Sequence, residues 1–134
     1  MTVIDTSGVV DLLIGGPASP IVADLLARER ELAAPDILVF EVLSVIRRGA
    51  RRRALSESRA AAAVEDIAAL PVRLFPSMPL RSRVWQLREN LTSADGLFVA
   101  LAERLGEPLA TKDSSLLRAI ASLPGVDAHT IPLI

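Results

Sequence analysis

The chain opens its first structural unit with Thr2-Val3-Ile4-Asp5-Thr6-Ser7-Gly8-Val9-Val10-Asp11-Leu12-Leu13-Ile14. The apolar run from Thr2 to Ile4 predicts a short buried strand, and the segment from Val9 to Ile14 predicts a helix. The four residues between them are typical of a strand-to-helix turn, and the following Gly15-Gly16-Pro17 marks the end of the helix. The stretch therefore predicts one βα unit with a single carboxylate, Asp5, at its junction.

The rest of the chain repeats this alternation of short apolar runs and longer segments with helical periodicity. The predicted strands are 2–4, 31–34, 71–75, 108–111 and 126–131. The predicted helices are 9–14, 20–30, 35–49, 56–70, 80–90, 93–105 and 114–123. We find no internal repeat or low-complexity linker. The pattern predicts one α/β domain over residues 1–134, with three α/β/α layers around a central, mostly parallel five-stranded sheet.

Composition restricts the class of protein further. Of the 134 residues, 51% are hydrophobic and 3% are aromatic, which suits one core built from Ala, Val, Leu and Ile. The chain has no Cys and a single His, His129, so a disulfide framework and a His-based hydrolase are poor explanations. No apolar run is long enough to cross a bilayer, and the start of the chain lacks a signal-peptide pattern. We expect a cytoplasmic bacterial protein without membrane contact.

Four acidic residues lie where the predicted elements meet: Asp5, Glu41, Asp95 and Asp113. Ligands of open parallel sheets bind beyond the carboxyl ends of the strands, and Asp5 and Asp113 each follow a predicted strand there. Asp95 opens the helix before the strand at 108–111, and Glu41 lies about one turn inside its helix. These carboxylates are therefore the candidates for catalysis and for holding a divalent metal ion.

Each acid also has a structural explanation. An Asp after a strand often caps the next helix, which applies to Asp5 and Asp113. Asp95 forms a capping-box pattern with Thr92. Glu41 is harder to explain this way, because its helix is apolar nearly all round, which predicts a carboxylate in or beside the core. A buried charge requires a cation or an Arg partner, so a shared metal ion is the more economical interpretation.

Four segments carry a family resemblance. They are Val3-Ile4-Asp5-Thr6-Ser7, Pro35-Asp36-Ile37-Leu38-Val39-Phe40-Glu41-Val42, Ser93-Ala94-Asp95-Gly96-Leu97-Phe98-Val99-Ala100-Leu101-Ala102-Glu103 and Pro108-Leu109-Ala110-Thr111-Lys112-Asp113. In this order and spacing they resemble the PIN domain, in the form found in VapC toxins of bacterial toxin–antitoxin pairs. Many relatives have an aromatic residue where this chain has Ser93-Ala94, and some have a further acid after the fourth, where it has Ser114-Ser115-Leu116. These departures favour one well-held metal ion over two.

The resemblance implies a metal-dependent endoribonuclease that hydrolyses RNA phosphodiester bonds as the toxin of a type II toxin–antitoxin pair. The implied catalytic and metal-binding quartet is Asp5, Glu41, Asp95 and Asp113. We expect Mg²⁺, with Mn²⁺ as a substitute, held directly by Asp5 and Asp95 and partly through water by the other two acids. The resemblance also implies that Thr6 supports Asp5 through its hydroxyl group. The implied partners are RNA, a cognate VapB-like antitoxin and a second copy of the chain, with a heterotetramer or a larger assembly in the antitoxin complex.

Basic residues gather in one short stretch of the chain, and all but one of the 15 basic residues are Arg. The stretch contains Arg47, Arg48, Arg51, Arg52 and Arg53. These residues are the candidates for RNA contacts, because guanidinium groups match phosphate oxygens. A solvated helix end is the alternative explanation.

Two further features concern partners. The apolar segments 9–14, 21–26 and 37–46 offer a candidate groove for an antitoxin segment, although the domain's own core also needs them. Trp85 is expected to be a partly buried anchor of its helix or of an interface, with base stacking as the alternative.

Two other functions are compatible with an acidic pocket but involve no RNA cleavage. A receiver-like phosphotransfer domain also places Asp residues and a Lys around Mg²⁺, but this chain lacks adjacent acids after the first strand. A catalytically weak PIN-fold binding module keeps the fold and engages only a partner. Neither a Walker loop nor a Gly-rich dinucleotide motif is present, which excludes nucleotide hydrolysis and hydride transfer.

Overall fold

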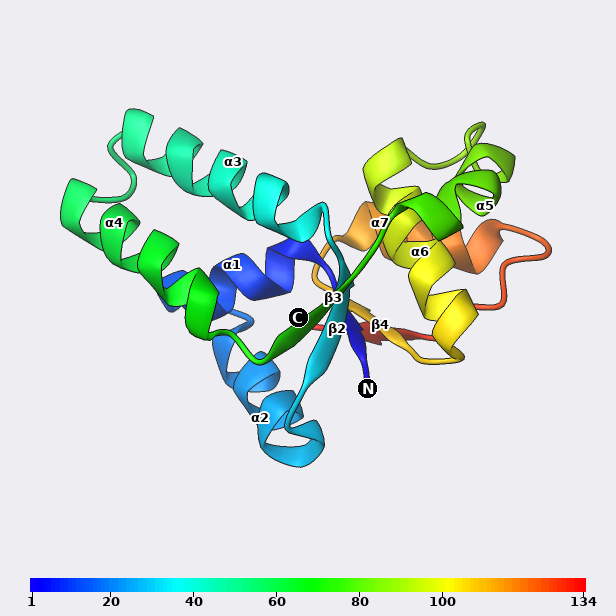
Figure 1. Ribbon diagram of the computed structural model, residues 1–134, viewed down its shortest axis with the longest axis horizontal. Helices are drawn as coiled ribbons and strands as arrows, with labels where there is room; N and C mark the ends of the chain where they lie inside the picture. The colour runs from blue at the N-terminus through cyan, green and yellow to red at the C-terminus, as the bar shows by residue number, and fades with distance from the viewer.

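The computed structural model describes residues 1–134 as three layers, in which a β-sheet separates two groups of helices (Figure 1). The sheet has five strands in the order β3-β2-β1-β4-β5, and every neighbouring pair is parallel. The strands are β1 (Val3–Ile4), β2 (Leu32–Pro35), β3 (Val72–Phe75), β4 (Leu109–Thr111) and β5 (Thr130–Pro132). The predicted three-layer α/β/α architecture with a five-stranded sheet is therefore confirmed.

The helices divide between the two sides of the sheet, with α1 to α4 on one side and α5 to α7 on the other (Figure 1). They are α1 (Thr6–Ile14), α2 (Ser19–Glu29), α3 (Leu38–Arg51), α4 (Glu57–Asp66), α5 (Arg81–Gln86), α6 (Ser93–Leu105) and α7 (Ser114–Ser122). Two short 3₁₀ turns, η1 (Ile67–Ala69) and η2 (Met78–Leu80), connect them. No single helix is long and apolar enough to span a membrane, and only α1 and α2 together, bent by 103°, meet the length and composition required.

Helix α1 starts directly at the carboxyl end of β1. The backbone of Asp5 is extended, and its carboxylate accepts the Gly8 N–H, which caps the helix. At the other end, Gly15 has φ 74°, a left-handed conformation that glycine reaches without steric cost, and its N–H donates to the carbonyl of Asp11. The two ends fix α1 as a short helix whose first turn holds Asp5 at the edge of the sheet.

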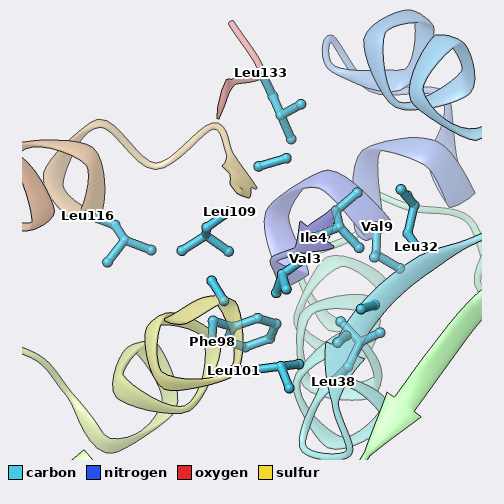
Figure 2. Close-up of a cluster of buried hydrophobic side chains, with 14 of the residues drawn as sticks. Val3, Ile4, Val9, Leu32, Leu38, Phe98, Leu101, Leu109, Leu116 and Leu133 are labelled. Carbon is cyan, nitrogen blue, oxygen red and sulfur yellow. The ribbon is translucent and has the colours of Figure 1, made fainter. Parts of the chain in front are cut away.

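The central strands and α6 form the middle of the core (Figure 2). Val3, Ile4 and Leu109 of β1 and β4 are completely buried, and Phe98 and Leu101 of α6 are nearly so. Because α6 packs against both strands, the strand ends and the first turn of α6 share one rigid support. The fold thereby holds several chain segments in fixed positions at the carboxyl edge of the sheet.

Several predicted element boundaries are wrong. Helix α1 begins at Thr6, three residues before the predicted start, and α4 ends at Asp66, where the 3₁₀ turn η1 replaces the predicted last turn. Pro35 ends β2 and lies opposite Phe75 instead of opening the next helix. Proline is tolerated there because the strand terminates and its ladder needs no further donor. The helix predicted over 80–90 is a 3₁₀ turn followed by a shorter α5. The strand predicted over 126–131 is confined to Thr130–Pro132, the three residues that lie opposite β4.

Arg83 of α5 connects three segments that are distant in sequence. Its Nε and Nη2 donate to the two carboxylate oxygens of Glu103 at 2.8 and 2.9 Å, and Nη2 also donates to the Gly125 carbonyl. The Asp127 N–H donates to the same carboxylate at 3.1 Å. Burial acts to raise the pKa of Glu103, but the hydrogen bonds outweigh burial and hold this pKa below its usual range. One charged cluster therefore ties α5, α6 and the segment before β5 together.

Arg83→Met is expected to lower the free energy of unfolding by about 1–2 kcal/mol, because it leaves the Gly125 carbonyl without its donor and Glu103 with the Asp127 N–H alone. Urea-induced unfolding measures the effect. Arg28→Met is the matched control, since Arg28 is exposed on α2 and makes no ion pair or side-chain hydrogen bond. A loss no larger for Arg83→Met than for the control would contradict the connecting role.

Candidate metal centre

The largest cavity has a volume of about 600 Å³ and is lined by all four predicted acids. Asp5 comes from the β1–α1 junction and Asp113 from the β4–α7 junction. Glu41 lies in the first turn of α3, and Asp95 lies in the first turn of α6. Residues from four separate segments meet because the sheet places β1 beside β4 and because α6 packs on both strands.

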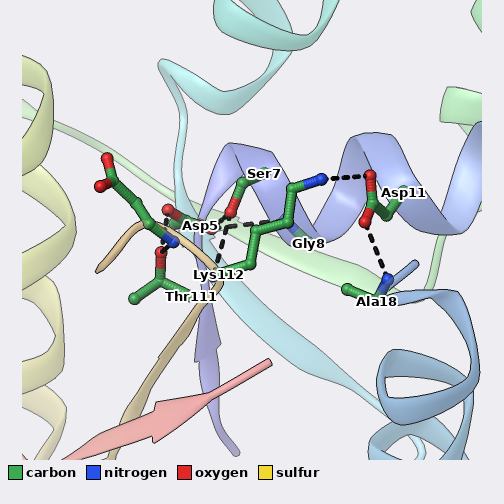
Figure 3. Close-up of polar contacts among 8 residues, drawn as sticks. Asp5, Ser7, Gly8, Asp11, Ala18, Thr111 and Lys112 are labelled. Atoms are coloured by element: carbon green, nitrogen blue, oxygen red, sulfur yellow. Dashed lines mark hydrogen bonds and ion pairs between the residues drawn. The ribbon is translucent and has the colours of Figure 1, made fainter. Parts of the chain in front are cut away.

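Both oxygens of Asp5 accept hydrogen bonds (Figure 3). Oδ1 accepts the Ser7 hydroxyl at 2.6 Å and the Gly8 N–H at 3.3 Å, and Oδ2 accepts the Thr111 hydroxyl at 2.6 Å. The Thr111 Oγ1 in turn accepts the Asp113 N–H at 3.0 Å. A continuous chain of hydrogen bonds therefore fixes the orientation of Asp5 relative to the strand end that carries Asp113.

Burial raises the pKa of Asp5 above its usual range. The hydroxyl and N–H donors act in the opposite direction, and the nearby charge of Asp113 raises the pKa further. No Lys or Arg pairs with Asp5 within 4 Å. The carboxylate is therefore oriented by hydrogen bonds but lacks a positive partner from the protein.

Asp95 faces the cavity, and another residue caps its helix. Thr92 is the N-cap of α6, and its hydroxyl accepts the Asp95 N–H at 3.1 Å. The Thr92 backbone N–H donates no hydrogen bond to the Asp95 carboxylate, so the predicted capping box is incomplete. Burial raises the pKa of Asp95, the Thr92 hydroxyl offsets part of this shift, and the charges of the other three acids raise it again. The four carboxylates therefore repel one another across one cavity.

Glu41 lies half-buried beside the core, and its Oε1 accepts the Thr6 hydroxyl at 2.6 Å. The expectation that Thr6 supports Asp5 is therefore wrong, because other hydroxyl groups hold Asp5 and Thr6 orients Glu41. Helix α3 is not buried all round, since the neighbouring Phe40 is 69% exposed.

Asp113 caps α7 and also lines the cavity. Its Oδ1 accepts the N–H groups of Ser115 and Leu116 at 2.9 and 3.2 Å, which caps α7. Its Oδ2 accepts no hydrogen bond from the protein, and the residue is exposed at the cavity. Capping therefore orients Asp113 without using all of its acceptor capacity.

The donor set fits a hard divalent cation, because carboxylate oxygens are the ligands that such ions prefer. No three Asp, Glu or His side chains lie close enough together to hold one metal ion between them. Magnesium is usually bound by one or two carboxylates with water at the remaining positions. Direct binding by some of the acids, with the others acting through water, therefore suits this cavity better than a cage of all four.

Sequence patterns did not single out several residues that line the cavity or hold the acids in it. Ser7 and Thr111 hold Asp5, and Lys112 donates from Nζ to Asp11 at 2.7 Å. The signal for the two hydroxyl residues was proximity along the chain, because each lies two positions from a predicted acid. The Lys112–Asp11 pair had no such signal, since the two residues meet only through the packing of α1 beside β4.

The five Arg residues of the basic stretch are all exposed, and none makes an ion pair or a side-chain hydrogen bond. They are Arg47, Arg48, Arg51, Arg52 and Arg53. Only Arg48 lines the cavity together with the acids. The structure therefore separates one Arg at the cavity from four around the solvated end of α3.

Trp85 is 67% exposed, so the prediction of a partly buried anchor within the chain is wrong. Its ring lies 4.4 Å from the Arg88 guanidinium, and it lines a groove of about 370 Å³ together with Met78 and Arg81. Exposed apolar side chains therefore gather on α5 and the turn before it.

An all-parallel sheet with carboxylates converging beyond its strand ends defines a class of α/β proteins built to bind a hard cation. The family model of the PIN domain matches residues 2–122. Ribonuclease VapC12 of Mycobacterium tuberculosis is 40% identical over 119 residues, 89% of this chain and 92% of that protein. Ribonuclease VapC1 of the same species is 41% identical over 125 residues, 92% of this chain and 91% of that protein. The chain belongs to the PIN-domain family and, within it, to the VapC type of ribonuclease.

Solved structures agree with the fold at low sequence identity. The crystal structure of PAE2754 from Pyrobaculum aerophilum gives a TM-score of 0.70 at 19% identity, over 96% of this chain and 82% of that one. A toxin–antitoxin complex from Klebsiella pneumoniae gives a TM-score of 0.63 at 20% identity, over 100% of this chain and 98% of the matched chain. These proteins therefore share the fold of this chain although their sequences differ at most positions.

Proposed function

We propose that this protein is the endoribonuclease toxin of a type II toxin–antitoxin pair and that residues 1–134 act as a single PIN domain. The observation that carries the proposal is the convergence of four carboxylates on one cavity. Their chain positions are dispersed, so their meeting reflects the fold and not local helix capping alone. The similarity to VapC ribonucleases over most of the chain supports RNA as the substrate.

The cation in this proposal is Mg²⁺, with Mn²⁺ as a substitute. Asp5 and Asp95 are the proposed direct ligands. Burial and the charges of neighbouring acids raise the pKa of both carboxylates, and neither has a positive partner from the protein. Glu41 and Asp113 are proposed to act partly through water. When bound, such a cation lowers the pKa of a coordinated water and neutralises charge on a phosphodiester. The chain's own hydroxyl groups keep the acids oriented, and no protein nucleophile is required.

Arg48 is the proposed phosphate contact within the basic stretch. It lines the cavity with the acids, whereas Arg47, Arg51, Arg52 and Arg53 do not. The outer four then contribute a weaker, longer-range attraction for RNA. Because none of these guanidinium groups is engaged by the protein, all their donors remain free for phosphate oxygens.

Arg48→Gln is expected to weaken RNA binding about three- to tenfold and to reduce the salt dependence of binding by about 0.7 in the slope of log K against log salt. Fluorescence anisotropy with a labelled RNA in the presence of a chelator measures both quantities. Arg52→Gln removes the same charge outside the cavity and is expected to change binding less. Equal losses for the two variants would place the phosphate contacts on the helix end instead.

The proposed protein partners are a VapB-like antitoxin and a second copy of the chain. Most of the predicted antitoxin groove serves the domain's own core, since Val9, Val22 and Val42 are buried. Some apolar side chains nevertheless remain exposed to solvent: Phe40 on α3 and Met78 before α5 are each 69% exposed. Exposed apolar side chains on two elements provide contact area for self-association or for an antitoxin segment. A homodimer that assembles with antitoxin into a heterotetramer or larger complex is the arrangement we propose.

The test of the function is induced expression in a bacterium, with growth and new RNA 5′-phosphate ends recorded. Growth arrest and discrete cuts are expected for the wild type, and neither for Asp95→Asn. Asp24→Asn is the matched control, because Asp24 is exposed on α2 and makes no ion pair or side-chain hydrogen bond. Arrest that persists in Asp95→Asn without RNA cuts would favour the binding-module alternative. The family assignment already disfavours the receiver alternative.

A further inference from the structure

Lys112 is the only lysine of the chain, and it lines the acidic cavity. Its Nζ donates to Oδ1 of Asp11 at 2.7 Å, and its backbone N–H donates to the Ser7 hydroxyl at 3.3 Å (Figure 3). The Lys112 side chain is 29% exposed, whereas that of Asp11 is only 4% exposed. The pair therefore joins a fixed, buried carboxylate to a cation that remains accessible from the cavity.

Asp11 is held by the chain around it. Its Oδ2 accepts the Ala18 N–H at 2.8 Å, so both of its oxygens are engaged. The loop after α1 approaches so closely that a Cβ on Gly16 would lie 2.4 Å from Asp11 Oδ1. This position therefore requires glycine. The loop is shaped around the Asp11 carboxylate, which gives Lys112 a rigid anchor.

The anchor keeps the ammonium group away from the four acids. Asp11 is the only carboxylate within 4 Å of Lys112 Nζ, although Asp113 is its neighbour in sequence. An ammonium group has three N–H donors, and only one of them has a protein acceptor here. The remaining donors are free for a ligand in the cavity.

We propose that Lys112 is a phosphate-binding residue for the RNA and that Asp11 is the positioning residue that holds it at the cavity wall. This inference rests on the proposed ribonuclease function. An RNA phosphodiester placed beside the four acids is negatively charged, and the carboxylates of the cavity repel it. A fixed cation on the wall offsets that repulsion, and lysine serves as a point-charge phosphate binder.

The positioning role has a separate consequence. Without the Asp11 carboxylate, the ammonium group is released beside four carboxylates that have no positive partner. It then turns toward them and competes with the divalent cation for the same oxygens. Asp11 therefore acts on both RNA binding and cation binding through the position of Lys112.

The first experiment measures binding of a labelled single-stranded RNA by anisotropy in the presence of a chelator. Lys112→Met is expected to weaken binding about tenfold and to lower the salt slope by about 0.7, while Lys112→Arg retains most of the affinity. In cleavage assays the loss is expected mainly as a higher KM with little change in kcat. Arg28→Met, which removes a distant exposed charge, is expected to leave both assays unchanged. Unchanged RNA affinity and salt slope in Lys112→Met would overturn the proposal.

The second experiment measures Mn²⁺ binding to the protein without RNA by electron paramagnetic resonance. Asp11→Asn is expected to weaken Mn²⁺ binding several-fold, and Asp11→Asn/Lys112→Met is expected to restore it. Wild-type Mn²⁺ affinity in a folded Asp11→Asn, or no restoration in the double variant, would overturn the positioning role. If Asp11→Asn fails to fold, the comparison of Lys112→Met with Lys112→Arg decides the phosphate contact. A wild type that neither binds nor cleaves RNA would instead reject the proposed function itself.

Discussion

Asp5→Asn is expected to reduce the rate of RNA cleavage by about 1,000-fold or more while the protein remains folded. The substitution removes one carboxylate that binds the cation and so supports the transition state. Its loss is expected to raise the activation free energy by several kcal/mol. The substitution also changes the hydrogen-bond chain. An amide NH₂ group in place of Oδ2 would face the Thr111 hydroxyl, which already accepts the Asp113 N–H and would lose its own acceptor. The amide therefore disturbs the orientation of two strand ends as well as the charge.

Single-turnover cleavage of a labelled RNA at saturating Mg²⁺ measures this effect, with Asp24→Asn as the control carboxylate. The unfolding free energy of Asp5→Asn is expected to stay within about 1 kcal/mol of the wild type, because removing a desolvated charge compensates for the weakened hydrogen bond. Cleavage within tenfold of the wild type would return Asp5 to the role of a helix cap.

A divalent cation is expected to stabilise the wild type by roughly 2.7 kcal/mol at a cation concentration about 100 times its Kd. The stabilisation arises because the ion binds the folded chain, where four carboxylates share one cavity, and not the unfolded chain, where they are far apart. Thermal unfolding with Mg²⁺ or Mn²⁺, compared with NaCl at equal ionic strength, measures the effect. Asp5→Asn/Asp95→Asn is expected to lose most of it. Equal stabilisation of the wild type and the double variant would place the cation elsewhere.

The same acids give the metal-free protein a characteristic pH dependence. The pKa values of Asp5 and Asp95 are raised in the folded state, first by burial, so folding binds protons at these sites. Their destabilising contribution is therefore absent below the ordinary aspartate pKa and grows as the pH rises through the raised values. Glu29 and Glu103 act in the opposite direction, because their pKa values are lowered and their stabilisation disappears on acidification.

The difference in unfolding free energy between the wild type and Asp5→Asn/Asp95→Asn isolates the acidic pair from the other groups. We expect the wild type to gain stability relative to the double variant as the pH falls toward the ordinary aspartate pKa. Saturating Mg²⁺ is expected to reverse this trend, because protons and the cation then compete for the same oxygens. A difference that does not change with pH would show that burial does not perturb these carboxylates.

The sequence by itself determined the class of fold and the identities of the four acids. The apolar run at Val3-Ile4 and the helical periodicity of 93–105 are local patterns, and local patterns are what hydrophobic spacing reveals. Element ends do not follow from local patterns alone, as Pro35 shows, because a strand end depends on its neighbour across the sheet. The predicted partner of Thr6 was wrong for a related reason, since hydroxyl bonding depends on which side chains meet in space.

Tertiary structure alone decided how the cavity is constructed. Asp5 receives the Thr111 hydroxyl, and Asp11 receives Lys112, only because the sheet places β1 beside β4 and α1 packs there. Neither contact can be predicted from hydrophobic periodicity, because each joins residues at least 100 positions apart. The sequence therefore specified which charges are present, while the packing of β1, β4 and α1 determined which of them are paired and which remain free for a cation or for RNA.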